Sequence, residues 1–225
     1  MSFVVGIDGP AGTGKGTITK LVSEDLGLVN IDTGATYRCV TLEMLNKNVD
    51  ISEKEKIIEI SKNIDINMIN DNGAQRVFLN GKDVSEEIRS KEVTALVSQV
   101  SSYTEVRLNM VKLQRKLAEG KDVIMEGRDI TTYVFPNADV KIYLDADEEE
   151  RAKRRYKQNM EKGINTSYEE VLENIRWRDH NDKNKEIGSL KIANDAVVID
   201  TTNLSIEEVK EKVENLINTR RNGKC

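Results

Sequence analysis

Several residue types that mark special classes of protein are scarce in this sequence of 225 residues. Two cysteines, Cys39 and Cys225, are too few for a disulfide framework, and no CxxC pair or His/Cys spacing indicates a zinc or redox site. Only two prolines, Pro10 and Pro136, are present, and no linker between domains is apparent. No apolar run approaches the length of about eighteen residues that a transmembrane helix needs. With no signal peptide either, we expect a cytoplasmic protein with no membrane partner.

Charge of one sign is not concentrated anywhere in the chain. The formal net charge is −5, from 39 acidic and 34 basic residues, and no block of like charge suggests a nucleic-acid-binding tail. Small molecules are therefore the expected partners. The length fits a single domain over residues 1–225, and the modest aromatic content, without an apolar surface stripe, favours a monomer.

A glycine-rich motif follows the apolar run at residues 3–7 and precedes an amphipathic helical pattern. Gly9, four further residues, Gly14 and Lys15 have the P-loop spacing, in which backbone N–H groups and a helix N-terminus face a phosphate chain. Because motif and flanking context agree, we expect a nucleoside triphosphate rather than a glycine turn without ligand. The expected ATP-binding residues are Gly9, Pro10, Ala11, Gly12, Thr13, Gly14, Lys15, Gly16 and Thr17.

The usual hydroxyl residue directly after the P-loop lysine is displaced by one position. Gly16 intervenes before Thr17, which resembles the nucleotide-kinase variant GxxGxGKGT. We expect Mg²⁺ as the cofactor together with ATP, and the metal ligands stay open because Thr17 lies one residue late.

Five short apolar runs predict buried strands, with helical patterns between most of them. They lie at residues 3–7, 28–31, 123–125, 140–144 and 196–199. This order predicts an α/β fold with a doubly wound, five-stranded parallel sheet. A capping box at Ser205 and Glu208 predicts the start of a last helix.

One stretch departs from this alternation between the second and third predicted core strands. Alternating apolar residues and the hairpin signal Asn80-Gly81 predict a small antiparallel β insertion at about 64–84. We interpret it as part of a mobile subdomain, and a surface hairpin with no ligand role is the alternative.

Two arginines follow predicted strands at the edge where open α/β sheets bind ligands. Arg38 comes after the second strand, and Arg128 comes directly after the third. Planar, bidentate guanidiniums opposite a P-loop suit an acceptor phosphate facing a donor triphosphate. For either arginine alone, a surface ion pair is the competing interpretation.

A basic helix in the second half of the chain is a candidate lid over residues 151–167. Arg151 and Arg155 are four residues apart and share a helix face. A hinged segment that carries arginines would neutralise charge and exclude water during phosphoryl transfer. A solvated helix with Glu149 and Glu150 paired to the arginines is the alternative.

Taken together, these motifs resemble those of bacterial cytidylate kinases, from Val4 to about Lys212. The resemblance is carried by the P-loop variant and by three further spaced motifs: Asp32-Thr33-Gly34-Ala35-Thr36-Tyr37-Arg38, Ser98-Gln99-Val100 with Arg107, and Gly127-Arg128-Asp129 with Val134-Phe135-Pro136. It implies an adenylate-kinase-like P-loop fold, with residues 33–100 as the monophosphate-binding insertion.

The resemblance also implies roles for individual residues. Cytosine would be read by Thr33, Ser98, Arg107 and Asp129, the acceptor phosphate would be held by Arg38, Arg128 and Arg178, and the sugar by Asp182. The reaction would be ATP-dependent phosphorylation of CMP and dCMP to CDP and dCDP. We expect the catalytic charges to be Lys15, Arg128, Arg178, Arg151 and Arg155.

The chain departs from the family where arginine is common. Asn181, Lys183 and Lys185 occupy that segment, and Gly188-Ser189-Leu190 replaces a Ser-Pro-Leu-like turn. Lys185 keeps the charge but loses the planar fork, so its contact with base or phosphate is less directional. A relative with altered acceptor choice, such as UMP, AMP or shikimate, is the alternative. A GTP-binding switch would need Asn-Lys-x-Asp, and residues 181–184 have the wrong order.

Overall fold

A parallel sheet of five strands forms the centre of the computed structural model, which describes residues 2–71, 74–161 and 163–223. Its strands are β1 (Val4–Asp8), β2 (Val29–Asp32), β6 (Val123–Gly127), β7 (Val140–Asp145) and β8 (Val197–Asp200). Their spatial order is β2-β6-β1-β7-β8, and every neighbouring pair is parallel. The predicted five-stranded sheet is confirmed. Cys225 lies outside the described residues.

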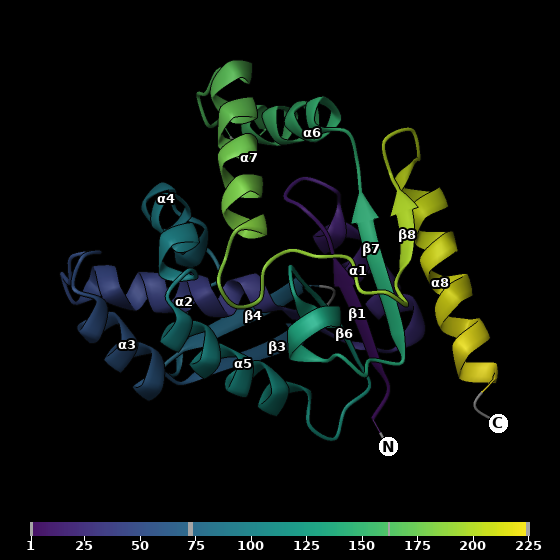
Figure 1. Ribbon diagram of the computed structural model, residues 1–225, viewed down its shortest axis with the longest axis horizontal. Coiled ribbons are helices and arrows are strands. Elements are labelled where there is room, and N and C mark those ends of the chain that lie inside the picture. The colour runs from purple at the N-terminus through teal and green to yellow at the C-terminus, as the bar shows by residue number, and fades with distance from the viewer. Residues whose placement is uncertain (1, 72–73, 162, 224–225) are drawn as a thin grey trace.

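Helices cover both faces of this sheet (Figure 1). The side chains of Val5 and Ile7 pack with α1 (Lys15–Leu26) and α8 (Ile206–Asn222), whereas Val4, one residue along, packs with α5 (Thr104–Ala118). This alternation follows from the two-residue period of a strand. The capping box at Ser205 is present at the start of α8. Within the described ranges no helix combines the length and apolar character needed to cross a membrane.

A second body of structure lies between β2 and β6 in the chain, on the left of Figure 1. It consists of α2 (Thr33–Asn46), α3 (Lys54–Asn63), β3 (Ile66–Asp71), β4 (Ala74–Leu79), β5 (Lys82–Asp83), the 3-10 turn η1 (Glu87–Arg89) and α4 (Lys91–Val100). The three strands form an antiparallel sheet in the order β3-β4-β5. Asn80 and Gly81 have φ values of 50° and 82°, which suits the type I′ turn that Asn-Gly predicts. The predicted β insertion is confirmed.

Two helices, α6 (Glu148–Glu161) and α7 (Tyr168–Lys183), stand beyond the carboxyl end of β7 (Figure 1). They pack through a small core around Ala152, Val171 and Ile175, and the rings of Tyr156 and Tyr168 meet edge to face at 6.2 Å. Residue 162 of the predicted lid lies outside the described part of the chain. Together with the insertion, this helix pair surrounds the edge of the sheet where the predicted ligand residues lie.

Candidate active site

The P-loop folds as its sequence predicts, with Lys15 at the first position of α1. Gly14 adopts φ 89° before the helix, and a Cβ on Gly9 would lie 2.1 Å from the Leu144 carbonyl oxygen of β7. The first position of the motif therefore tolerates only glycine, because the loop runs directly against the neighbouring strand. The first turn of α1 carries no acidic side chain, so its N-terminal N–H groups are available to an anion.

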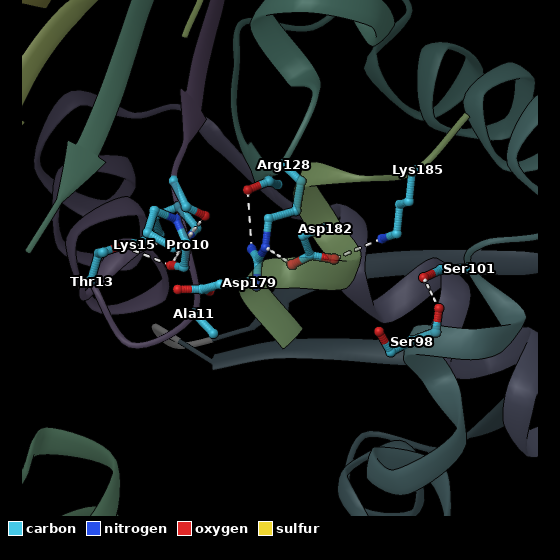
Figure 2. A network of polar contacts seen from close by, with 12 residues as sticks. Pro10, Ala11, Thr13, Lys15, Ser98, Ser101, Arg128, Asp179, Asp182 and Lys185 are labelled. Carbon is cyan, nitrogen blue, oxygen red and sulfur yellow. Dashed lines mark hydrogen bonds and ion pairs between the residues drawn. The ribbon is translucent and has the colours of Figure 1, made fainter. Parts of the chain in front are cut away.

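Lys15 turns back into the loop that it belongs to. Its Nζ donates to the carbonyl oxygens of Gly9 and Pro10, both at 2.7 Å, and the residue is 5% exposed (Figure 2). Burial, reinforced by the charge of Arg128, lowers the pKa of Lys15, while burial beside Asp32 raises the pKa of Glu126. The protein therefore compensates neither charge fully. An anionic ligand beside Lys15 would stabilise the charged lysine, and a cation beside Glu126 would stabilise the carboxylate.

A chain of buried and half-buried charges, Arg128, Asp182 and Lys185, extends across the site from the P-loop (Figure 2). Arg128 Nε donates to Asp182 Oδ2 at 2.7 Å, and Lys185 Nζ donates to Asp182 Oδ1 at 2.8 Å. Although burial opposes ionisation of Asp182, Arg128 and Lys185 hold its pKa well below the usual range. Lys185 therefore keeps the carboxylate of α7 in place, which it does as a point charge without a guanidinium fork.

Four further arginines lie beside this chain and form what we call the arginine rim: Arg38, Arg89, Arg155 and Arg178. Burial lowers the pKa of Arg178 to about 10, and the charges of Arg128, Arg38 and Arg155 contribute to that shift. Burial likewise lowers the pKa of Arg155, with Arg89 as the neighbouring charge. Among the residues that the structure describes, Arg178 has no ion-pair partner. Guanidiniums held this close together, one of them without an ion-pair partner in the described chain, favour binding of a multiply charged anion.

Two of the predicted base-reading residues, Arg107 and Asp129, form a buried ion pair. Arg107 Nη2 donates to Asp129 Oδ2 at 2.5 Å, with exposed side-chain fractions of 2% and 6%. Arg107 also lies over the ring of Tyr37 at 5.3 Å and donates to the Ser101 carbonyl at 3.2 Å. A buried ion pair with further hydrogen-bonding atoms in reach is suited to reading the edge of a base.

The other two predicted base contacts, Thr33 and Ser98, take no part in this ion pair. Thr33 is buried, and its hydroxyl donates to the Glu126 carbonyl at 2.7 Å, so it already has a partner. Ser101 lines the cavity, at the end of α4. Ser98 lies one turn earlier on that helix and is 9% exposed (Figure 2). The Ser98 assignment stays a prediction, and Ser101 is a residue of the cavity that the sequence did not indicate.

The two predicted lid arginines differ in environment, although they share a helix. Arg151 is 5% exposed, donates to the carbonyl oxygens of Ala11 and Ala146 at 3.0 Å, and pairs with Asp179 at 2.7 Å. It therefore joins α6 and α7 to the P-loop. Arg155 is half-buried and donates to Gln158 Oε1 at 2.7 Å.

Asp8 fixes the segment that carries Arg128 and Asp129. Its two carboxylate oxygens accept from the backbone N–H groups of Ile130 and Thr131, both at 2.8 Å. The following turn, Ile130–Val134, is a π-helix, a form that often occurs at functional sites. Because Asp8 directly precedes Gly9, these hydrogen bonds connect the P-loop to the turn that follows Arg128 and Asp129.

One cavity of about 860 Å³ connects these groups. Its lining includes most of the predicted site residues: Ala11, Gly12, Gly14, Lys15, Gly16, Thr17, Thr33, Arg38, Arg107, Arg128, Asp129, Arg178, Asp182 and Lys185. It also includes Tyr37, Arg89, Ser101 and Glu126, which we did not assign from the sequence. Of these, Glu126 could have been identified from the sequence, since it lies next to the end of the same strand that Arg128 follows. Arg89 reaches the cavity only through the folding of the insertion.

A P-loop at the carboxyl edge of a parallel sheet, opposite a rim of arginines in one cavity, defines a P-loop kinase. The cytidylate kinase family model matches residues 5–219. Over 209 residues the chain is 51% identical to the cytidylate kinase of Caldicellulosiruptor saccharolyticus, which covers 93% of this chain and 92% of that one. It is 48% identical to the Bacillus subtilis cytidylate kinase over 209 residues, which covers 93% of each chain. This protein belongs to the cytidylate kinase family.

A solved structure confirms the likeness of fold alone. An uncharacterized protein from Eubacterium ventriosum superposes with a TM-score of 0.51 at 10% sequence identity, over 96% of this chain and 99% of that chain. Identity at this level carries no information about substrate.

Proposed function

We propose that this protein transfers the γ-phosphoryl group of ATP to CMP and dCMP, giving CDP or dCDP and ADP. The single observation that carries the proposal is that one cavity joins the P-loop to the arginine rim and to the Arg107–Asp129 pair. These three parts correspond to a triphosphate, an acceptor phosphate and a base. Membership of the family supports the same reaction and does not favour UMP, AMP or shikimate as acceptor.

The proposed transfer is a direct, in-line displacement. An acceptor phosphate oxygen bonds to the γ-phosphorus as the bond to the β–γ bridging oxygen breaks, and that oxygen leaves with ADP. The acceptor oxygen is already ionised near neutral pH, so no general base is needed, and catalysis comes from positioning and charge stabilisation. Lys15 and the P-loop amides would hold the β- and γ-phosphates, while Arg38, Arg128 and Arg178 align the acceptor. Arg155, which donates to Gln158 in this structure, would turn toward the transferred group from α6, and Arg151 holds that helix against the P-loop.

Base choice would come from buried donors and acceptors. Arg107 and Asp129 present a donor and an acceptor that cytosine can satisfy with its carbonyl oxygen and its amino group. Uracil inverts part of that pattern, because a second carbonyl oxygen would face the carboxylate and leave it unpaired. Asp182, held between Arg128 and Lys185, is the proposed sugar contact.

The groups near the P-loop suit Mg²⁺ bound with ATP. Glu126 and Thr17 line the cavity with oxygen atoms that can bind a cation, and within the described residues the half-buried Glu126 carboxylate accepts one hydrogen bond, from the Thr19 hydroxyl at 3.4 Å. The described residues hold no cluster of three or more metal-ligating side chains, so phosphates and water would supply most of the ligands. When bound, the ion would neutralise charge on the β- and γ-phosphates.

Glu126→Gln should therefore weaken the response to Mg²⁺. We expect the Mg²⁺ concentration for half-maximal rate to rise about tenfold or more, as it does when groups around a metal are changed. A Mg²⁺ titration at fixed ATP measures it, and excess EDTA should abolish turnover. Glu24→Gln is the matched control, because Glu24 lines the same cavity from α1 but is exposed. An unchanged titration for Glu126→Gln would contradict this role.

The direct test of the reaction is ADP release with Mg-ATP and each of CMP, dCMP, UMP and AMP in turn. We expect turnover with CMP and dCMP, and kcat/KM at least ~100-fold lower with UMP or AMP, since a missing hydrogen bond in a polar site is heavily penalised. Preference for another acceptor would contradict the base assignment and leave the kinase mechanism intact.

We further propose a monomer in the cytoplasm, because one chain supplies every part of the cavity and both substrates are soluble nucleotides.

A further inference from the structure

The loop that follows α7 connects the phosphate side of the site to the base side. We call residues 184–190 the clasp. At its start, Lys185 pairs with Asp182, and at its end the Leu190 N–H donates to the Asp182 carbonyl at 2.7 Å. Between them, Glu186 Oε2 accepts from the Thr104 hydroxyl of α5 at 2.9 Å. The clasp is therefore attached to both α7 and α5.

Gly188 is the point at which the clasp touches the Arg107–Asp129 pair. Its carbonyl oxygen accepts from Arg107 Nη2 at 3.3 Å, and its backbone has φ +64°. A Cβ added at this position would lie 2.1 Å from Asp129 Oδ2 and 2.3 Å from Arg107 Nη2. Both distances are far below van der Waals contact, so a side chain here would displace the ion pair or the clasp.

The ion pair has little room in which to move. Arg107 is held by the Ser101 carbonyl and by the ring of Tyr37, and the two side chains of the pair are at least nine-tenths buried. Close packing means that displacing one buried group disturbs its neighbours. A side chain at position 188 would therefore displace Arg107 and Asp129, the proposed base contacts, although Gly188 lies outside the P-loop and the arginine rim.

We propose that Gly188 is a positioning residue for base recognition, which lets the clasp close over Arg107 and Asp129 and hold both in the orientation that reads an aminopyrimidine. This inference rests on the proposed function, through the assignment of Arg107 and Asp129 to the base. It also gives a role to the Gly-Ser-Leu segment by which the chain departs from its family. Lys185 and Gly188 then act at two points of the clasp, Lys185 on the proposed sugar contact and Gly188 on the proposed base contacts.

The test compares Gly188→Ala with Gly120→Ala. Gly120 has φ +70°, but a Cβ there meets nothing within 4 Å, so the control carries the same backbone strain without the steric contact. We expect Gly188→Ala to raise the KM for CMP about tenfold or more and to lower the preference for CMP over UMP, since small misplacements in a site have large effects. The KM for ATP should stay within about twofold of wild type because the P-loop is unaltered. Gly120→Ala should leave both constants unchanged.

A second variant covers the case in which Gly188→Ala does not fold. Thr104→Val removes the hydrogen bond to Glu186 without adding bulk, and it should raise the KM for CMP by a few-fold and not that for ATP. If Gly188→Ala folds, an unchanged KM for CMP would overturn the proposal, and so would an equal rise in the KM values for ATP and CMP. If Gly188→Ala does not fold, an unchanged KM for CMP in Thr104→Val would overturn it. Wild-type turnover with CMP is measured alongside, so failure of the proposed function is seen separately from failure of this inference.

Discussion

Lys15→Ala should lower kcat by ~10³-fold or more, because it removes the positive charge that we propose to act on the β- and γ-phosphates. In the structure Lys15 Nζ is held by the Gly9 and Pro10 carbonyl oxygens, at the start of α1. Binding of a triphosphate would replace these neutral acceptors with charged ones. The charge of the lysine then acts on the phosphates, where negative charge is redistributed during the transfer.

The measurement is steady-state ADP release with Mg-ATP and CMP, with the purified variant checked for folding by its melting temperature. Lys20→Ala is the matched control, because Lys20 lines the same cavity further along α1 and is exposed. We expect the control to retain turnover within about threefold, as for a solvated surface charge. Retained turnover in Lys15→Ala would contradict the P-loop assignment itself.

The fold could be predicted largely from short-range patterns. Three of the five core strands, β1, β6 and β7, are apolar runs buried on both faces, which is a strong local signal. The edge strand β8 was expected to be buried but is mostly exposed, because no strand covers its outer side. The P-loop has a fixed spacing because its backbone must wrap a phosphate chain, so Gly9, Gly14 and Lys15 could be identified directly. Asn80-Gly81 predicted the hairpin for a similarly local reason, since both residues adopt positive φ.

The remaining site residues depend on contacts between distant segments, which no local pattern records. Arg89 approaches Arg155 only because the insertion and α6 fold toward the same cavity. The sequence indicated Tyr37 only as part of a motif. Its packing beneath Arg107 is a tertiary contact that the motif does not predict. The burial of Arg151 could not be predicted either, because a sequence cannot show that Asp179, on the next helix, is its ion-pair partner.

Asp129→Ala should weaken both folding and CMP binding, because it leaves the Arg107 guanidinium buried without its carboxylate. We expect the free energy of unfolding to fall by about 3–5 kcal/mol, the usual cost of removing one partner from a buried ion pair. We expect the KM for CMP to rise ~100-fold with little change in the KM for ATP, because the base loses its charged acceptor. Urea unfolding measures the first effect and steady-state kinetics the second.

The double variant Arg107→Met/Asp129→Ala separates these two effects. Replacing both charges removes the unpaired guanidinium, so part of the lost stability should return relative to Asp129→Ala alone. Recognition of cytosine should not return, because neither the donor nor the acceptor of the pair is left. Recovery of CMP affinity together with stability would mean that Arg107 and Asp129 only support the fold, and base reading would then have to be reassigned to other groups of the cavity, such as Ser101 and Tyr37.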